Sequence, residues 1–232
     1  MKPIAVFRHS PGEGPGYFAT FLDRHSLPWE LFRLDEGVMP PAAPDGFSGL
    51  CFMGGPMSVN DDLPWITQTL ELIRAADRKG IPVIGHCLGG QLMSRAFGGS
   101  VTKNPVKEIG WGMVEATAAA ADWIGDTPRF EAFHWHGETF SLPQGATRLL
   151  GSNHCEHQAF VRGPHLGLQC HVEMTDSMIR TWCLQWEAET VPASASVQTP
   201  EQMQSGMDAR ITAMRVVADR LYSRWIRGLK QD

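Results

Sequence analysis

One cysteine, Cys87, stands where a nucleophile would be expected. The apolar run 81–84 leads into residues 85–89, which read Gly-His-Cys-Leu-Gly, and a helical pattern follows. A strand, a tight turn and a helix start in this order form the nucleophile elbow of α/β enzymes, here with cysteine in place of serine. The N–H groups at the helix N-terminus favour the reactive thiolate. The alternative is a small, buried, unreactive cysteine in a glycine-rich turn.

A thiol nucleophile needs a general base, and the base needs an orienting partner. Among nine histidines, His171 is best placed, because the apolar stretch before it is typical of a strand end. Alternation along an extended backbone puts Glu173 on the same side as His171. Its carboxylate can then bond one ring nitrogen and leave the other facing the thiol. Alternatively, the two side chains are solvated neighbours on a surface strand.

Attack on a carbonyl creates an oxyanion, which requires fixed N–H donors. The turn Gly54-Gly55-Pro56 follows an apolar strand and can aim a backbone N–H into the site, since glycine has no Cβ in the way. The N–H of Leu88, directly after Cys87, is the expected second donor. The alternative is an ordinary turn between a strand and a helix.

Two histidine-rich segments suggest a metal site as a competing interpretation. One contains His134 and His136, and the other contains His154, Cys155 and His157. These residue types bind zinc, but here they would have to converge from separate loops. We therefore expect no metal at these positions, and expect the side chains to line a pocket or face water.

The elements that must position these residues alternate between strand and helix in the first half of the chain. Apolar runs predict strands at 2–8, 29–34, 47–53 and 81–84, and helical spacing predicts helices at 17–25, 64–79 and 88–97. Such alternation predicts a parallel sheet with crossover helices. The glycine-rich loop 10–16 lacks the dinucleotide-binding spacing and is expected to be a flexible connection.

The second half is predicted to be a β-rich insertion that returns to the main sheet, followed by helices. Its short strands are expected at 101–102, 112–117, 130–134, 147–152, 158–161 and 167–170. A helix at 175–187, a connector at 191–200 and a long amphipathic helix at 200–229 complete the chain. Residues 1–232 are expected to form one domain, with a C-terminal helical extension at about 198–232.

Composition excludes several classes of protein. The chain has 232 residues, 43% of them hydrophobic and 19% charged, as in ordinary globular proteins. A net charge of −5 without a basic block argues against binding nucleic acid. No apolar run approaches the roughly 20 residues of a membrane span, and the first residues do not resemble a signal peptide. Five cysteines without C-x-x-C spacing indicate reduced thiols in a cytoplasmic protein.

These motifs together resemble the class I glutamine amidotransferases, of the stand-alone type similar to the amidotransferase domain of GMP synthase. The matching stretches follow the family's order and lie at 54–56, 85–91, 108–111, 134–140, 152 with 158–160, and 167–173. The resemblance implies a flavodoxin-like three-layer fold, with a mostly parallel central sheet, helices on both faces and a small β-rich insertion.

The resemblance also implies the roles of individual residues. By position, Cys87, His171 and Glu173 correspond to the family's Cys–His–Glu triad, and the N–H groups of Gly55 and Leu88 to its oxyanion hole. It places substrate contacts at four further positions, namely Gly54, Gln91, Trp135 and His136. No metal or organic cofactor is implied.

The chain departs from the family pattern beside the expected base. The family usually has an aromatic residue, His, Pro and Glu in this stretch, whereas this chain has Cys170, His171, Val172 and Glu173. The spacing of His and Glu is kept, so the triad is expected to survive. Losing the proline loosens the turn, and losing the aromatic ring alters the packing beside His171.

Three functions are compatible with this pattern. The first is glutamine amidotransferase or glutaminase chemistry, in which ammonia passes to an acceptor on a synthetase subunit. The second is hydrolysis of a γ-glutamyl peptide without a partner, because the chain has no ATP-binding loop of its own. The third is a non-catalytic binding or regulatory module. Glutamine or a γ-glutamyl compound is the expected ligand in the first two.

Overall fold

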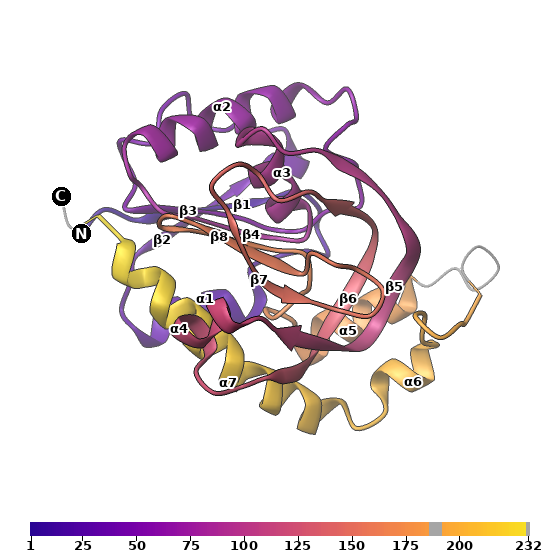
Figure 1. Cartoon of the computed structure of the whole chain (residues 1–232). Helices are drawn as coiled ribbons and strands as arrows, with labels where there is room; N and C mark the ends of the chain where they lie inside the picture. Colours follow the sequence, from indigo (N-terminus) through magenta and orange to yellow (C-terminus); the bar gives the residue numbers. More distant parts are fainter. Residues whose placement is uncertain (186–191, 231–232) are drawn as a thin grey trace.

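A nine-stranded sheet runs through the middle of the molecule, and helices cover both of its faces (Figure 1). The computed structural model describes residues 1–185 and 192–230. The strands lie in the order β2-β1-β3-β4-β9-β8-β7-β5-β6. Their bounds are β1 Ile4–Arg8, β2 Trp29–Arg33, β3 Gly49–Phe52, β4 Val83–His86, β5 Val101–Ala116, β6 Arg129–Phe140, β7 Thr147–Gly151, β8 Ala159–Arg162 and β9 His165–Leu168.

Helices α2 and α3 lie on one side of the sheet, and α1, α4 and α7 lie on the other (Figure 1). The α-helices are α1 Gly16–Arg24, α2 Pro64–Arg78, α3 Leu88–Ala96, α4 Ala121–Ile124, α5 Asp176–Leu184, α6 Pro200–Gln204 and α7 Met207–Trp225. Short 3₁₀ turns occur at Leu34–Glu36, Ala118–Ala120 and Ile226–Gly228. Within the described residues, no helix has the length and apolar character needed to cross a membrane.

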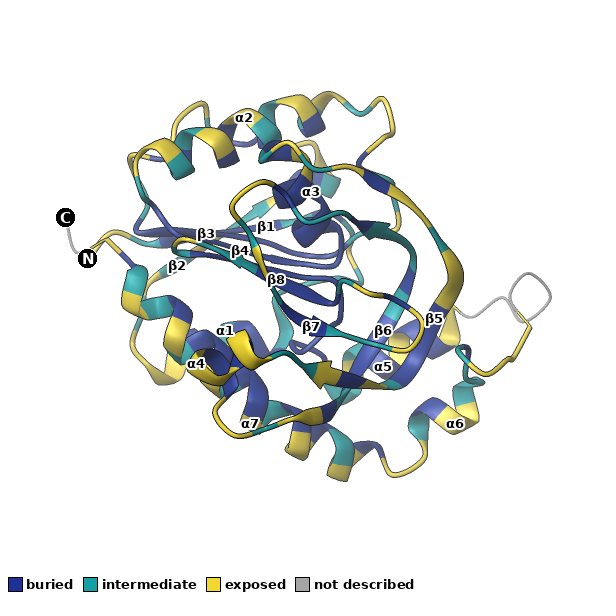
Figure 2. Ribbon diagram, viewed as in Figure 1, coloured by how far each residue is buried: buried dark blue, intermediate teal, exposed yellow. Residues whose placement is uncertain are grey.

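Alternation along the strands divides the apolar core between the two faces. Ile4 and Val6 of β1 belong to the cluster that includes α1 and α7, whereas Ala5 and Phe7 belong to the cluster that includes α2 and α3. The central strands β3, β4 and β9 are buried along their whole length. Figure 2 shows the buried strands enclosed by helices whose outer faces are exposed. Burial on both faces explains why these strands are continuous apolar runs.

The predicted α/β fold with helices on both faces is confirmed, and the sheet is mixed rather than strictly parallel. Strands β2, β1, β3, β4 and β9 are parallel neighbours. Strands β8, β7, β5 and β6 add to this half with antiparallel pairing. The predicted β-rich insertion therefore extends the main sheet, and β9 returns to pair with β4.

Several predicted elements have different bounds. The separate strands at 101–102 and 112–117 are one strand, β5, whose register shifts between Lys103 and Glu108. The strand expected at 167–170 ends at Leu168, and the helix expected at 175–187 ends at Leu184. The long helix expected at 200–229 is wrong, because Gly206 adopts φ +64° and separates α6 from α7. Residues 186–187 and 191 of the predicted helix and connector lie outside the described residues.

Candidate active site

Cys87 occupies a strained turn between β4 and α3. Its φ of +49° and ψ of −106° lie in a region that residues with a side chain rarely adopt. Two hydrogen bonds hold this conformation, from Cys87 N–H to the Leu168 carbonyl at 2.8 Å and from Gln91 N–H to the Cys87 carbonyl at 3.0 Å. The elbow predicted from the glycine spacing is therefore present, with Cys87 at the N-terminus of α3.

Three glycines allow the chain to pack this tightly. A Cβ on Gly85 would overlap the backbone of Gly89, and a Cβ on Gly89 would overlap the carbonyl oxygen of Phe52. A Cβ on Gly90 would overlap the carbonyl oxygen of Leu168. Any larger residue would push α3 away from the sheet and displace the nucleophile.

His171 and Glu173 form a buried pair beside this elbow. The His171 Nδ1 atom lies 2.6 Å from Glu173 Oε1, and both side chains are almost completely buried. In the part of the chain that the structure describes, His171 Nε2 has no hydrogen-bond partner. His171 follows β9 and Cys87 follows β4, and these strands are neighbours in the sheet. The carboxylate thus holds one ring nitrogen of His171, as expected, and leaves the other without a hydrogen bond among the described residues.

The charges of the pair support each other. Burial lowers the pKa of His171, but the Glu173 carboxylate and the Cys87 thiol outweigh it and raise that pKa well above its ordinary value. Burial raises the pKa of Glu173, yet the charge of His171 and its hydrogen bond to the carboxylate bring that pKa down to about 2. The site therefore favours an imidazolium beside an ionised carboxylate.

A second buried histidine, His86, lies close to Glu173. His86 Nε2 lies 4.0 Å from Glu173 Oε2 and 3.1 Å from the hydroxyl oxygen of Tyr222 on α7. Burial lowers the pKa of His86, so the ring is neutral near pH 7. The C-terminal helix α7 is thus hydrogen-bonded to a histidine that lies next to Glu173.

Most of the predicted substrate contacts share one cavity with Cys87. This cavity has a volume of about 190 Å³, and its lining includes Gly55, Cys87, Gln91, Trp135 and His136. The Cys87 sulfur lies 4.0 Å from the Trp135 carbonyl oxygen. The cavity is large enough for a small substrate such as an amino acid and has the thiol in its wall.

The other predicted site residues lie beside this cavity. A Cβ on Gly55 would approach the Leu88 side chain to 2.8 Å, so the two expected oxyanion donors are neighbours. As the first residue of α3, Leu88 has an N–H without an intrahelical partner. Gly54 faces the base, since a Cβ there would lie 3.3 Å from His171 Cε1.

Two residues near the site have no role in the sequence analysis. Gln169 donates to the Cys87 sulfur at 3.5 Å and accepts from Gln91 at 3.2 Å. Its alternation with His171 and Glu173 could have indicated this position. Glu13 comes from the loop 10–16, and its carboxylate occupies the space beside Gly54. Burial raises the pKa of Glu13 to about 7. No local pattern identifies Glu13, because only the fold brings this loop to the sheet edge.

The two histidine-rich segments, which were not expected to form a metal site, come together in part. Glu108 of β5 lies 3.1 Å from His136, and Cys155 lies close to both. His134 is fully buried, and burial lowers its pKa to about 4. Of the described residues, Glu108, His136 and Cys155 are the group with the side-chain types and spacing to hold a metal ion.

Comparisons with known proteins agree with this geometry. A crystal structure of a glutamine amidotransferase from Methylobacillus flagellatus is 43% identical, with a TM-score of 0.97 and coverage of 100% of this chain and 97% of that chain. The glutamine amidotransferase-like protein YfeJ of Salmonella typhimurium is 31% identical, over 75% of this chain and 77% of its own length.

Two further relatives differ in activity. The γ-glutamyl peptidase 3 of Arabidopsis thaliana is 27% identical, over 71% of each chain. A GMP synthase from Thermomicrobium roseum is 32% identical over 54% of this chain, which covers 23% of that longer protein. The model of the family "Glutamine amidotransferase class-I" matches residues 27–188. This match spans the elbow, the buried His–Glu pair and the substrate cavity, and the chain belongs to the class-I glutamine amidotransferase family.

Proposed function

We propose that this chain cleaves the amide bond of a γ-glutamyl substrate, with glutamine as the substrate and ammonia as a product. One observation carries the proposal. The Cys87 thiol is held in a strained turn beside His171, whose Nδ1 is bound by Glu173 at 2.6 Å and whose Nε2 is unpaired among the described residues. Such an arrangement is suited to nucleophilic catalysis on a carbonyl.

The proposed reaction has two halves. The Cys87 sulfur attacks the γ-carbonyl carbon as a thiolate, with its proton already on His171 Nε2, and the N–H groups of Gly55 and Leu88 bind the oxyanion. His171 then protonates the leaving nitrogen, the C–N bond breaks, and a γ-glutamyl thioester remains on Cys87. Water attacks this thioester and gives its proton to His171. The thiolate is released as glutamate leaves, and the proton stays on His171 for the next cycle.

The acceptor of the ammonia is proposed to lie on another subunit. The related GMP synthase is named both for glutamine hydrolysis and for the synthesis of GMP. The region that matches this chain makes up only 23% of that protein's length. This chain would supply the glutamine-hydrolysing half to a separate synthetase. The cysteines of the structure are free thiols, which supports a location in the reducing cytoplasm.

Hydrolysis of a γ-glutamyl peptide is the second candidate. It is favoured by the similarity to γ-glutamyl peptidase 3, which extends over 71% of both chains. The two candidates share the thioester and differ in the leaving group, which is ammonia or the amino group of a peptide. Release of glutamate from glutamine, compared with release from a γ-glutamyl dipeptide, separates them. A protein that hydrolyses only the dipeptide would contradict the first candidate.

Covalent labelling tests the chemistry common to both candidates. A glutamine analogue with an electrophilic carbon at the γ position should add one molecule to the reduced, folded protein, as measured by intact mass. Cys87→Ala should abolish this mass shift, whereas Cys183→Ala, which removes a thiol on α5, should retain it. No adduct on the wild-type protein at saturating reagent would contradict the mechanism and favour the non-catalytic binding module.

A further inference from the structure

Glu108, His136 and Cys155 form a buried group on three separate segments. Glu108 belongs to β5, His136 to β6, and Cys155 to the loop after β7. Their potential ligand atoms all lie within 4.8 Å of one another. Only 4% of Glu108, 6% of His136 and 2% of Cys155 is exposed. None of the three belongs to the proposed triad.

The contacts of His136 place its Nε2 atom next to the Glu108 carboxylate. His136 Nδ1 lies 3.0 Å from the Glu138 carbonyl oxygen, which can only accept, so Nδ1 carries the proton. In the neutral ring, Nε2 then carries no proton and has a lone pair that can accept a hydrogen bond or bind a metal ion. It lies 3.1 Å from Glu108 Oε2, without the geometry of a hydrogen bond. Two buried lone pairs this close repel each other unless a proton or a metal ion lies between them.

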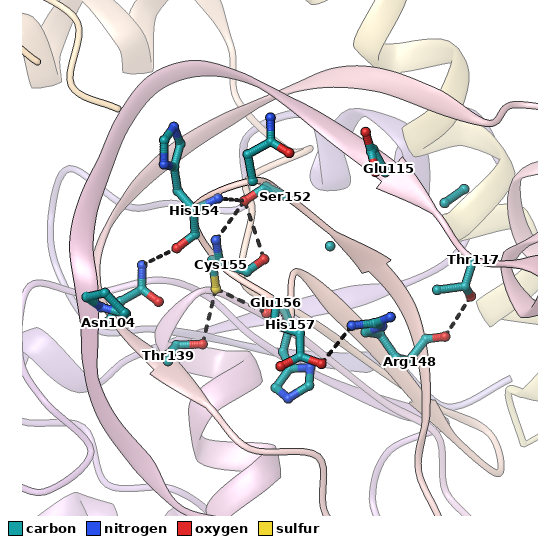
Figure 3. Close-up of a pocket in the computed structure, with 14 residues that line it drawn as sticks. Asn104, Glu115, Thr117, Thr139, Arg148, Ser152, His154, Cys155, Glu156 and His157 are labelled. Atoms are coloured by element: carbon teal, nitrogen blue, oxygen red, sulfur yellow. Dashed lines mark hydrogen bonds and ion pairs between the residues drawn. The ribbon is translucent and has the colours of Figure 1, made fainter. Parts of the chain in front are cut away.

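Each of the three side chains has a hydrogen bond that fixes its orientation. Ser152 donates to Glu108 Oε1 at 2.7 Å, and Gln158 donates to Glu108 Oε2 at 2.6 Å. The Thr139 hydroxyl lies 3.1 Å from the Cys155 sulfur. Figure 3 shows the Cys155 end of this arrangement, with Thr139 on one side and Ser152 on the other. Metal ligands are usually held by outer hydrogen bonds of this kind.

We propose that Glu108, His136 and Cys155 bind a divalent transition-metal ion, with zinc as the best match. A thiolate, an imidazole nitrogen and a carboxylate oxygen are the three ligand types that zinc takes in proteins. Zinc bonds of about 2.0–2.3 Å place tetrahedral ligand atoms roughly 3.3–3.7 Å apart. The separation of 3.1 Å between His136 and Glu108 is close to this range. The Cys155 sulfur lies within 4.8 Å of both and would move toward them on binding. The three ligands lie outside the proposed triad, although His136 also lines the substrate cavity.

A second cavity gives the ion a route to the site. Ser152, Cys155 and Thr139 lie in the wall of a cavity of about 710 Å³ on the antiparallel half of the sheet. His136 also lines the substrate cavity that contains Cys87. The ion would therefore fix one wall of the substrate cavity to β5 and to the loop after β7. Its expected role is to hold that wall in place.

Metal binding by the full-length protein tests the proposal. The protein is stripped with a chelator, loaded with Zn²⁺ or Co²⁺ and passed through a desalting column. Elemental analysis should find a single ion per chain, and the Co²⁺ form should show a thiolate-to-metal charge-transfer band. Retention of no metal above that of a metal-free control protein would overturn the proposal.

Variants then locate the ion. The charge-transfer band should persist in Cys87→Ala and in the control Cys183→Ala, and should be lost in Cys155→Ala. Loss in Cys87→Ala with retention in Cys155→Ala would place the metal on the proposed nucleophile and overturn the proposal. Should Cys155→Ala not fold, Ser152→Ala keeps all three ligands and should weaken Zn²⁺ binding by about 10-fold. Unchanged affinity in Ser152→Ala would then count against the site.

Discussion

The His171 ring has two partners with different tasks in the proposed reaction. Nε2 gives its proton to the leaving group and takes one from the attacking water, so the ring itself takes part in both halves of the reaction. Glu173 holds Nδ1 at 2.6 Å and stabilises the imidazolium, but it touches no reacting atom. Removing the ring and removing the carboxylate should therefore have unequal effects.

We expect His171→Ala to abolish turnover, because the ring is the proton carrier in both halves of the reaction. Glu173→Ala should leave measurable activity, lower by about 10²–10⁴-fold, because His171 loses only its orientation and its charge partner. Initial rates of glutamate release measure both effects. Equal and complete loss in the two folded variants would contradict the view of Glu173 as an orienting group.

Glu13 is a second carboxylate close to His171, and its burial makes its ionised form unfavourable. Burial raises its pKa from 4.5 to about 7. Between these pH values the folded protein holds a proton that the unfolded chain has released. The free energy of unfolding therefore falls as the pH rises through this window.

Glu13→Gln should remove this dependence. At pH 8 we expect the variant to be more stable than the wild type by about 1–3 kcal/mol, because a buried charge is removed. Below pH 4.5 the difference should be small, since the carboxyl is protonated in both states. Urea unfolding at several pH values measures the effect, with the exposed Glu71→Gln as control. An identical pH dependence in wild type and Glu13→Gln would contradict the burial of this charge.

The residues predicted for the site were those with a local signal. Cys87 is flanked by glycines, and His171 and Glu173 share one face of an extended stretch, so short-range spacing was sufficient. Glu13, His86 and Tyr222 could not be assigned, because their contacts cross 41 to 136 positions of the chain. Such contacts depend on the order of the strands, which no short pattern specifies.

At the scale of elements, the approach of α3 to the sheet determines where Cys87 points. Gly89 makes the closest of these contacts, with the carbonyl of Phe52. We expect Gly89→Ala to destabilise the fold by about 2–4 kcal/mol, because the added methyl group pushes α3 away from β3. Chemical denaturation measures the change in the free energy of unfolding.

Gly46→Ala is the matched control for Gly89→Ala. Gly46 is exposed, has no atom within 4 Å of an added Cβ and does not have a positive φ. This substitution should change stability by no more than about 0.5 kcal/mol. Similar effects of the two substitutions would show that the contact between α3 and the sheet is not tight.

The elements of the parallel half could be predicted because two-sided burial makes each strand a continuous apolar run. The antiparallel half was harder. Polar residues in the middle of β5 divide its pattern, so one strand resembled two. The helical spacing of buried residues continues from α6 into α7, so the pattern did not predict the break in the helix at Gly206. The amphipathic pattern indicated which face packs, but not where the backbone turns.

At the scale of the whole molecule, α7 packs directly on the central sheet. Trp225 is 1% exposed, and its ring lies against Gly49 of β3, where a Cβ would come within 3.0 Å of it. Tyr222 reaches His86 beneath the triad. These contacts support our proposal that the helical extension belongs to the same domain as the active site.

Trp225→Ala tests this proposal. It should lower the free energy of unfolding by about 3–5 kcal/mol, since it empties a large buried site. Activity and helical signal should then be lost together in one thermal transition. If α7 were a separate unit, its helical signal would melt first while glutamate release continued.

The pairing of β4 with β9 also bears on when the proposed nucleophile meets its proposed base during folding. Cys87 follows β4 and His171 follows β9, while β5 to β8 lie between them in the chain. During synthesis the nucleophile is therefore made well before its base. Long-range pairing of this kind forms late in folding. A nascent or partly folded chain would carry a thiol without its base. In the proposed reaction, glutamine would therefore be hydrolysed only by molecules in which the whole sheet has formed.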